Sequence, residues 1–224
     1  MRLLTRSDFD GICCAALLKE LRVIDEMEYA HPKDLQDGHV KVTSNDVLAN
    51  VPYVEGCGLW FDQHMSEDER LGAGLKFEGR SEHAPSAARV IFNHYGGENL
   101  GKFKEMLKYV DKVDSARLTK EEILNPTGWV LLGFLCDPRT GLGYYRGFRI
   151  SNLQMMSDLV DYIRKFPIIE ILDMPDIKER VEKYNNDQKV FEKFLRDNSR
   201  QDGPVAITDQ RGVPEIPTGN RFLI

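Results

Sequence analysis

The sequence predicts an α/β protein: a mostly parallel sheet flanked by helices, then a helical extension and the start of a second, C-terminal lobe. Three observations lead to this fold class. Short β-rich runs alternate with a helical segment through residue 62. From residue 85 to about residue 200, apolar residues recur at the spacing of one helix face. After residue 203 the pattern changes again, to two strand-like runs.

Four short runs are predicted as strands, because each is apolar or β-rich and is bounded by Pro, Gly, Asp or Asn. They span residues 2–5, 28–31, 40–43 and 58–62. A helix over residues 11–21 follows the first strand and carries small and apolar residues. A strand, a loop and then a helix is the usual opening of a parallel α/β sheet.

The rest of the chain is predicted to be mainly helical. The helices span residues 86–95, 100–113, 129–136, 152–166 and 176–198, and the last is poor in apolar residues, as expected of a helix that bridges two lobes. Two final strands are predicted at residues 205–208 and 220–224. We therefore divide the chain into a core (1–116), a helical extension with the inter-lobe helix (117–202) and the beginning of an incomplete lobe (203–224).

The composition is that of an ordinary globular protein, with 42% hydrophobic and 29% charged residues. A net charge of −6, from 30 basic and 36 acidic residues, argues against tracking long nucleic acid by electrostatics alone. No apolar run approaches the roughly 18 residues of a membrane span, and the first residues lack a signal peptide's apolar segment. Four cysteines without a Cys-x-x-Cys spacing indicate reduced thiols, so a cytoplasmic location is expected.

Acidic residues follow three of the predicted strands. Because the carboxyl ends of parallel strands meet at one edge of a sheet, we expect Asp8, Asp10, Asp46 and Asp62 to lie together. Carboxylates so close would repel one another, and a divalent cation removes that cost. For Asp8 and Asp10, capping of the following helix is an alternative, although one cap needs only one Asp.

These residues resemble the motifs of the DHH phosphoesterase superfamily, which contains metal-dependent phosphohydrolases. The run RSDFDG at residues 6–11 is similar to the first motif, His-x-Asp-x-Asp-Gly, and Asp46 is similar to the single aspartate of the second. The run FDQH at residues 61–64 looks like the Asp-His-His triplet. PSAAR at residues 85–89 resembles the helix after the triplet, and residues 110–116 resemble the fourth motif.

The resemblance implies a two-metal site, usually with manganese, and is closest to the exopolyphosphatase-like and small-oligonucleotide phosphodiesterase branches. It assigns Asp8 to the first metal, Asp10 to the second and Asp46 to both. Asp114 would complete the second site, with Asp111 as the alternative. The metals would activate a shared water and stabilise the charge that develops on the phosphate.

Two positions depart from the family pattern. The leading histidine of the first motif is Arg6, and the middle histidine of the triplet is Gln63. The remaining donors are almost all oxygens, Asp62 among them, which favours Mg²⁺ or Mn²⁺. His83 is a candidate for a replacement nitrogen ligand. Arg6 is expected either to contact a substrate phosphate or to pair with a neighbouring aspartate.

The resemblance also places His64 at the phosphate, so we count His64, Asp62 and Arg6 as catalytic candidates and His64 and Arg6 as substrate-binding ones. Residues 139–149 interleave glycines, aromatic residues and arginines, a composition able to hold phosphate and to stack a base. Arg146 and Arg149 are further substrate-binding candidates, and Arg221 is one in the second lobe. The alternative for this run is a connection between helices.

We therefore expect a phosphohydrolase that cleaves phosphoanhydride or phosphodiester bonds with a metal-activated water. Its substrate would be polyphosphate, a short oligonucleotide or a nucleotide. The competing hypothesis is a DHH-like protein that binds nucleotide or phosphate without hydrolysis, because two family histidines are absent. The sequence leaves the choice of substrate open, and it is compatible with a homodimer.

Overall fold

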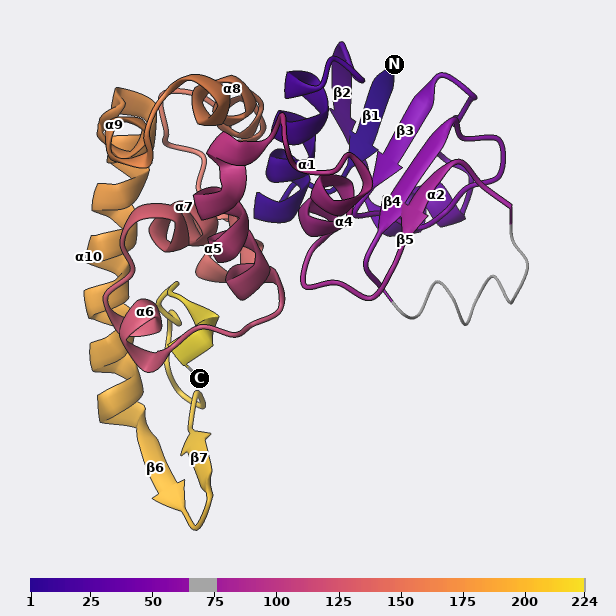
Figure 1. The fold of residues 1–224 in the computed structure, drawn as a ribbon. Coiled ribbons are helices and arrows are strands. Elements are labelled where there is room, and N and C mark those ends of the chain that lie inside the picture. Colours follow the sequence, from indigo (N-terminus) through magenta and orange to yellow (C-terminus); the bar gives the residue numbers. More distant parts are fainter. Residues whose placement is uncertain (65–75, 224) are drawn as a thin grey trace.

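The computed structural model describes residues 1–64 and 76–223, and its described strands form a five-stranded parallel sheet and a separate hairpin (Figure 1). The order in the sheet is β2-β1-β3-β4-β5, which confirms the predicted fold class. The strands are β1 (Arg2–Thr5), β2 (Glu26–Tyr29), β3 (Asp46–Ala49), β4 (Leu59–Asp62) and β5 (Gly79–Ser81). All four neighbouring pairs run parallel.

Both faces of this sheet are covered. On one face, Leu3, Val47 and Phe61 pack into the main core with the helices α1 (Phe9–Glu20) and α4 (Ala87–His94). On the other face, Leu4, Leu48 and Trp60 pack with the short helix α2 (Pro32–Gln36). A strand that is buried on both faces carries a continuous apolar run, without alternation of apolar and polar residues. The central strands of this sheet have such runs.

The loop after β1 requires a glycine. A Cβ added to Gly11 would lie 2.1 Å from the backbone oxygen of Arg6, so no larger residue fits without moving the loop. The next turn of α1 carries Cys13, Cys14, Ala15 and Ala16, all fully buried. These small side chains let α1 lie close to its neighbouring helices. The close contact of Gly11 with Arg6 O fixes the backbone of the loop that carries Arg6 and Asp8.

The helical region follows the sheet and ends in an arm, which consists of the long helix over residues 175–198 and the hairpin over residues 199–208 (Figure 1). Its helices are α5 (Lys104–Asp114), α6 (Lys120–Leu124), α7 (Gly128–Cys136), α8 (Asn152–Lys165), α9 (Ile168–Asp173) and α10 (Pro175–Asn198). Short 3₁₀ turns are η1 (Gly101–Phe103), η2 (Pro138–Thr140), η3 (Leu142–Tyr144) and η4 (Arg221–Leu223). The antiparallel hairpin of β6 (Ser199–Asp202) and β7 (Val205–Thr208) extends the long α10. Within the described residues, no helix has both the length and the apolar character that a membrane span requires.

Two predicted strands are wrong. Residues 40–43 form no strand, and the chain enters the sheet three residues later as β3. Residues 221–223 form the turn η4 in place of a strand. The side chain of the buried Asn220, just before this turn, accepts from Phe222 N, and Asn220 is itself held by Tyr184 and Gln188. The alternating run at 40–43 looks like a half-buried strand, whereas the true strand has no alternation to recognise.

Candidate active site

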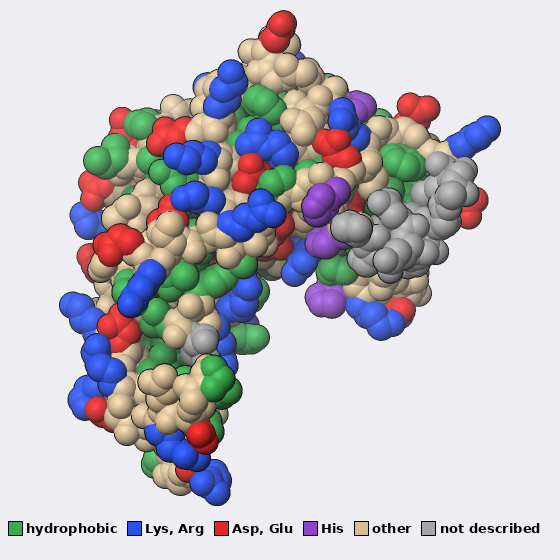
Figure 2. Space-filling model, turned by 60° about the horizontal axis from the view of Figure 1, so that its bottom comes forward, with side chains coloured by type: hydrophobic (Ala, Val, Ile, Leu, Met, Phe, Trp, Pro, Cys, Tyr) green, Lys and Arg blue, Asp and Glu red, His purple; other side chains and the backbone are tan. Residues whose placement is uncertain are grey.

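The carboxyl ends of β1 and β4 open onto a cavity of about 400 Å³. It lies between the sheet and the helices α5 and α7, and Figure 2 shows the molecule hollowed between the part that holds the sheet and the arm. Acidic, basic and apolar residues line it: Arg6, Asp8, Phe9, Asp10, His64, Val110, Val113, Asp114, Gly133, Asp137, Pro138 and Arg139.

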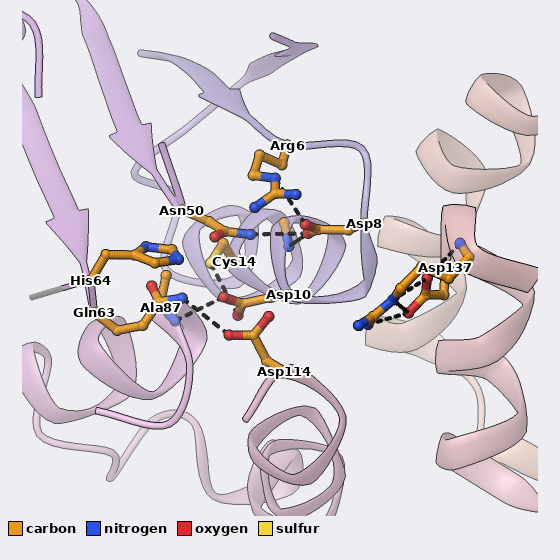
Figure 3. Close-up of polar contacts among 12 residues, drawn as sticks. Arg6, Asp8, Asp10, Cys14, Asn50, Gln63, His64, Ala87, Asp114 and Asp137 are labelled. Carbon is orange, nitrogen blue, oxygen red and sulfur yellow. Dashed lines mark hydrogen bonds and ion pairs between the residues drawn. The ribbon is translucent and has the colours of Figure 1, made fainter. Parts of the chain in front are cut away.

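Asp8 is the N-cap of α1 and accepts from Gly11 N at 2.9 Å. The same carboxylate accepts from Asn50 Nδ2 at 2.9 Å and pairs with Arg6 Nε at 3.2 Å (Figure 3). Capping and ion pairing are therefore both present at this one residue. Burial outweighs these contacts and raises the pKa of Asp8.

Asp10 lies two residues further along, in the first turn of α1, and ties α1 to α4. Its carboxylate accepts from Ala87 N at 2.8 Å and Ala88 N at 2.9 Å, at the positive end of α4 (Figure 3). Burial, followed by the charges of Asp114 and Asp8, raises the pKa of Asp10 well above its ordinary value. Asp10 is thus placed by backbone donors inside a group of like charges.

Asp114 is the last residue of α5, and its carboxylate lies beside that of Asp10 (Figure 3). Gln63 Nε2 donates to its Oδ2 at 3.1 Å, and Figure 3 shows Asp114 directed toward Asp10. Desolvation, followed by the charge of Asp8, raises the pKa of Asp114 to about 6. The structure therefore brings together three of the predicted metal ligands, Asp8, Asp10 and Asp114.

Asp62 and His64 form a pair beside this group. The imidazole Nδ1 of His64 lies 2.9 Å from Oδ1 of the buried Asp62, whose Oδ2 accepts from the backbone N–H of His64. The hydrogen bond to Asp62 raises the pKa of His64, because it stabilises the protonated ring. With Nδ1 engaged by Asp62, Nε2 is the ring nitrogen left for a substrate.

Two amide side chains that donate to this acidic group, on residues that do not line the cavity, also carry oxygens of the kind that a hard divalent cation accepts. Two buried amide oxygens, Oδ1 of Asn50 and Oε1 of Gln63, have no hydrogen-bond partner. The side chains that carry them are 1% and 8% exposed. Buried oxygens without a partner are costly, and carboxylate and amide oxygens are the ligands that Mg²⁺ and Mn²⁺ accept.

The nitrogen-containing pair of sites that the resemblance implies does not fit this chain. Arg6 lies against Asp8, and Gln63 lies against Asp114, where neither offers a nitrogen lone pair. Across residues 1–64 and 76–223, no three His, Cys, Asp or Glu side chains form a group that could hold a metal ion. Any cation here would depend on the amide oxygens as well as on the carboxylates.

Asp46 does not join the site, and the expectation that it would is wrong. It is the first residue of β3 and pairs with Arg2 at the start of β1, whereas Ala49 pairs with Thr5 at the other end. Three residues of strand, roughly 10 Å, separate it from the carboxyl edge. It accepts from Arg2 Nε at 2.7 Å and from Thr43 N at 2.7 Å, so its role is structural.

The other predicted residues lie elsewhere. Asp111 pairs with Arg89 and accepts from Ser86, so it is not the alternative to Asp114. Arg146 and Arg149 line a neighbouring cavity and not this one. His83, which is exposed, and Arg221, which lies in η4, line neither of these cavities.

Sequence reasoning missed Asn50, which takes the strand-end position expected for Asp46. It follows β3 directly and has φ of 57°, a left-handed conformation that Asn tolerates better than most residues. The run DVLAN carried the signal, since a short apolar run followed by Asn is a strand end with a turn. Asp137 was also missed. It pairs at the cavity wall with Arg139, the first residue of the run 139–149 that the sequence offered for phosphate.

Comparison with solved structures gives a match over nearly the whole chain. The structure is similar to that of the pGpG-specific phosphodiesterase PggH from Vibrio cholerae, with a TM-score of 0.90 and 43% sequence identity. The match covers 99% of this chain and 72% of that chain. No protein-family model matches the chain, and the curated proteins contain no significant match.

Proposed function

The chain belongs to the DHH-family phosphodiesterases, and from that premise we propose that it hydrolyses the phosphodiester bond of a short oligonucleotide such as pGpG. The observation that carries this proposal is the match to PggH over 99% of the chain. The group of Asp8, Asp10 and Asp114 in a cavity at the strand ends supports it. This similarity favours a phosphodiester over the phosphoanhydride of polyphosphate.

A hard divalent cation would be held by the carboxylates of Asp8, Asp10 and Asp114 only together with the amide oxygens of Asn50 and Gln63, since the acidic side chains of the described residues do not by themselves form a metal-binding group. The raised pKa values of the three carboxyl groups support this assignment, since a cation would offset the burial and repulsion that raise them. A bound Mg²⁺ or Mn²⁺ would supply stabilisation for the negative charge that develops on the phosphoryl oxygens.

Two side chains of the chain itself would act on the substrate. His64, whose Nδ1 is held by Asp62, would give the proton on Nε2 to the oxygen that leaves phosphorus. Arg6 is 44% exposed and uses one nitrogen on Asp8, so its remaining N–H groups are available for a phosphate oxygen. Both residues line the cavity.

The direct test is hydrolysis of pGpG, which takes up one water to give two GMP, by the whole chain and by single variants. Asp114→Asn is expected to lower kcat at least about 100-fold, and His64→Ala on the order of 100-fold. Asp173→Asn is the matched control, because this carboxylate is 74% exposed and lies in α9. Turnover that survives Asp114→Asn unchanged would contradict the proposal.

A second candidate is a protein that binds pGpG or another nucleotide without cleaving it. The observation that favours it is the Arg6 and Asp8 pair at 3.2 Å, which puts a fixed cation where the family has a metal ligand. In that case Arg6→Ala would weaken nucleotide binding in calorimetry, and no divalent metal would produce GMP. Robust hydrolysis by the unmodified chain would remove this candidate.

A further inference from the structure

A second cavity, of about 530 Å³, adjoins the candidate active site. The chain between α7 and α8 forms most of it. Pro138 lines both cavities, and Ser7, which lies between Arg6 and Asp8 in the chain, lines the second. A molecule whose phosphate lies at Asp8 can therefore extend into it, and its volume lies in the range of small-molecule sites.

An uncovered aromatic ring stands at this cavity. Tyr144 is 76% exposed, while the neighbouring rings are held by other groups. Tyr145 and Phe148 pack edge to face with centroids 4.7 Å apart, and the Arg180 guanidinium lies 4.1 Å from the Phe148 centroid. Tyr144 is thus the ring of this set that is free to stack on a planar ligand.

Both of the described charged residues that line the cavity are arginines, Arg146 and Arg149. Arg146 uses Nη1 on the oxygen of Gly143 at 2.7 Å, and Arg149 is 64% exposed with its Nε 3.5 Å from Asp176. A guanidinium has five N–H groups, so both arginines keep donors for a ligand. Guanine offers two acceptors, O6 and N7, on one edge, whereas adenine offers a donor in the place of O6.

The wall of the cavity is fixed to the long helix α10. Arg180 is fully buried and donates to Ile150 O at 2.8 Å and to Asn152 Oδ1 at 3.2 Å. Asn152 in turn donates to Leu142 O at 3.0 Å. These contacts hold both ends of the segment that carries Tyr144 and Arg146, so the cavity exists without a ligand.

We propose that this second cavity is a nucleobase subsite, in which Tyr144 stacks on a guanine of the substrate and Arg146 donates to its O6 and N7 edge. The inference rests on the proposed function and adds to it the part of the chain that distinguishes guanine from adenine. Tyr144 and Arg146 are binding residues here and take no part in bond cleavage.

The test compares four variants on pGpG and pApA and, separately, measures GMP binding by calorimetry, which needs no turnover. Tyr144→Ala is expected to raise KM for pGpG about tenfold or more, while Tyr144→Phe keeps the stacking ring and stays within about twofold. Arg146→Ala is expected to lower the preference for pGpG over pApA on the order of tenfold. Arg211→Ala is the charge control, since this arginine is 91% exposed near the hairpin.

The outcomes separate this inference from the proposed function. If the unmodified chain cleaves pGpG while Tyr144→Ala and Arg146→Ala keep its KM and preference, the subsite is overturned and the function stands. If no dinucleotide is cleaved but GMP binds and Tyr144→Ala weakens that binding, the subsite stands and the hydrolysis fails. Absence of both activities overturns both. Thermal melting of each variant shows that it is folded.

Discussion

The side-chain amide of Gln63 donates from Nε2 to Oδ2 of Asp114 at 3.1 Å, which joins the end of β4 to the end of α5. Arg6 makes the corresponding contact with Asp8 at 3.2 Å. Both positions at which this chain departs from its family therefore present N–H groups to carboxylates. The amide oxygen of Gln63 is left buried without a partner, beside the acidic group.

Restoring the two histidines is expected to create nitrogen ligands at these positions. In the double variant Arg6→His and Gln63→His, Mn²⁺ should bind at least about tenfold more tightly, because the guanidinium beside Asp8 and the amide N–H on Asp114 are each replaced by a side chain that can offer a nitrogen lone pair. Calorimetric titration with Mn²⁺ measures this, with each single variant as its own control. An unchanged affinity would show that these positions do not face the cation.

Cation binding is expected to depend on pH through Asp114. Its pKa is raised to about 6, so at pH 5 the carboxyl carries a proton that a cation must displace. Mg²⁺ affinity should therefore rise between pH 5 and pH 7.5 and then level off. Titrations at both pH values measure it, and Asp114→Asn should reduce this dependence together with the affinity.

The metal-free protein should show the opposite trend in stability. The folded state holds the Asp114 proton up to about pH 6, whereas an unfolded chain releases it near 3.8. The free energy of unfolding should therefore fall as the pH rises from about 4 to 6, with Asp8 and Asp10 acting in the same direction. Urea unfolding in a chelator measures this, and a rise across that window would contradict the assignment.

The comparison of sequence and structure shows where pattern reasoning worked. The position of residues 6–11 between β1 and α1 could be predicted from the sequence, because an apolar run precedes them and a glycine and a series of small residues follow. Asp46 was misplaced because a four-residue strand buried on both faces has no alternation, while the exposed run before it does. Asn50 was missed because β3 was predicted at residues 40–43. Only the true bounds of β3, Asp46–Ala49, put Asn50 at the end of that strand.

Asp46→Ala should therefore affect stability and not catalysis. Burial by itself would raise the pKa of Asp46. The hydrogen bonds from Arg2 and Thr43 outweigh burial and lower that pKa, so the charged form is the stable one. Its removal takes the acceptor from Nε of Arg2 and from the N–H and hydroxyl of Thr43, at a cost of about 1–3 kcal/mol. Urea unfolding and kcat are both measured at a temperature where the variant is folded. Lost turnover with unchanged stability would return Asp46 to the site.

Gly11→Ala should disturb the site by moving its loop. The added Cβ meets the backbone oxygen of Arg6 at 2.1 Å, so the loop that carries Arg6 and Asp8 must shift, at about 1–3 kcal/mol. Gly101→Ala is the matched control, because nothing lies within 4 Å of its Cβ position. A fully active and equally stable Gly11→Ala variant would show that the loop is not fixed by this contact.

Chromatography of pGpG incubated with the purified chain measures whether the chain cleaves a dinucleotide at an oxygen-lined cation site. We predict that GMP accumulates with Mg²⁺ or Mn²⁺ and that chelation, or Asp114→Asn, stops it. Intact pGpG with either metal would show that the chain does not cleave this dinucleotide, and GMP formation that neither chelator nor the variant affects would show that the cleavage does not use this site.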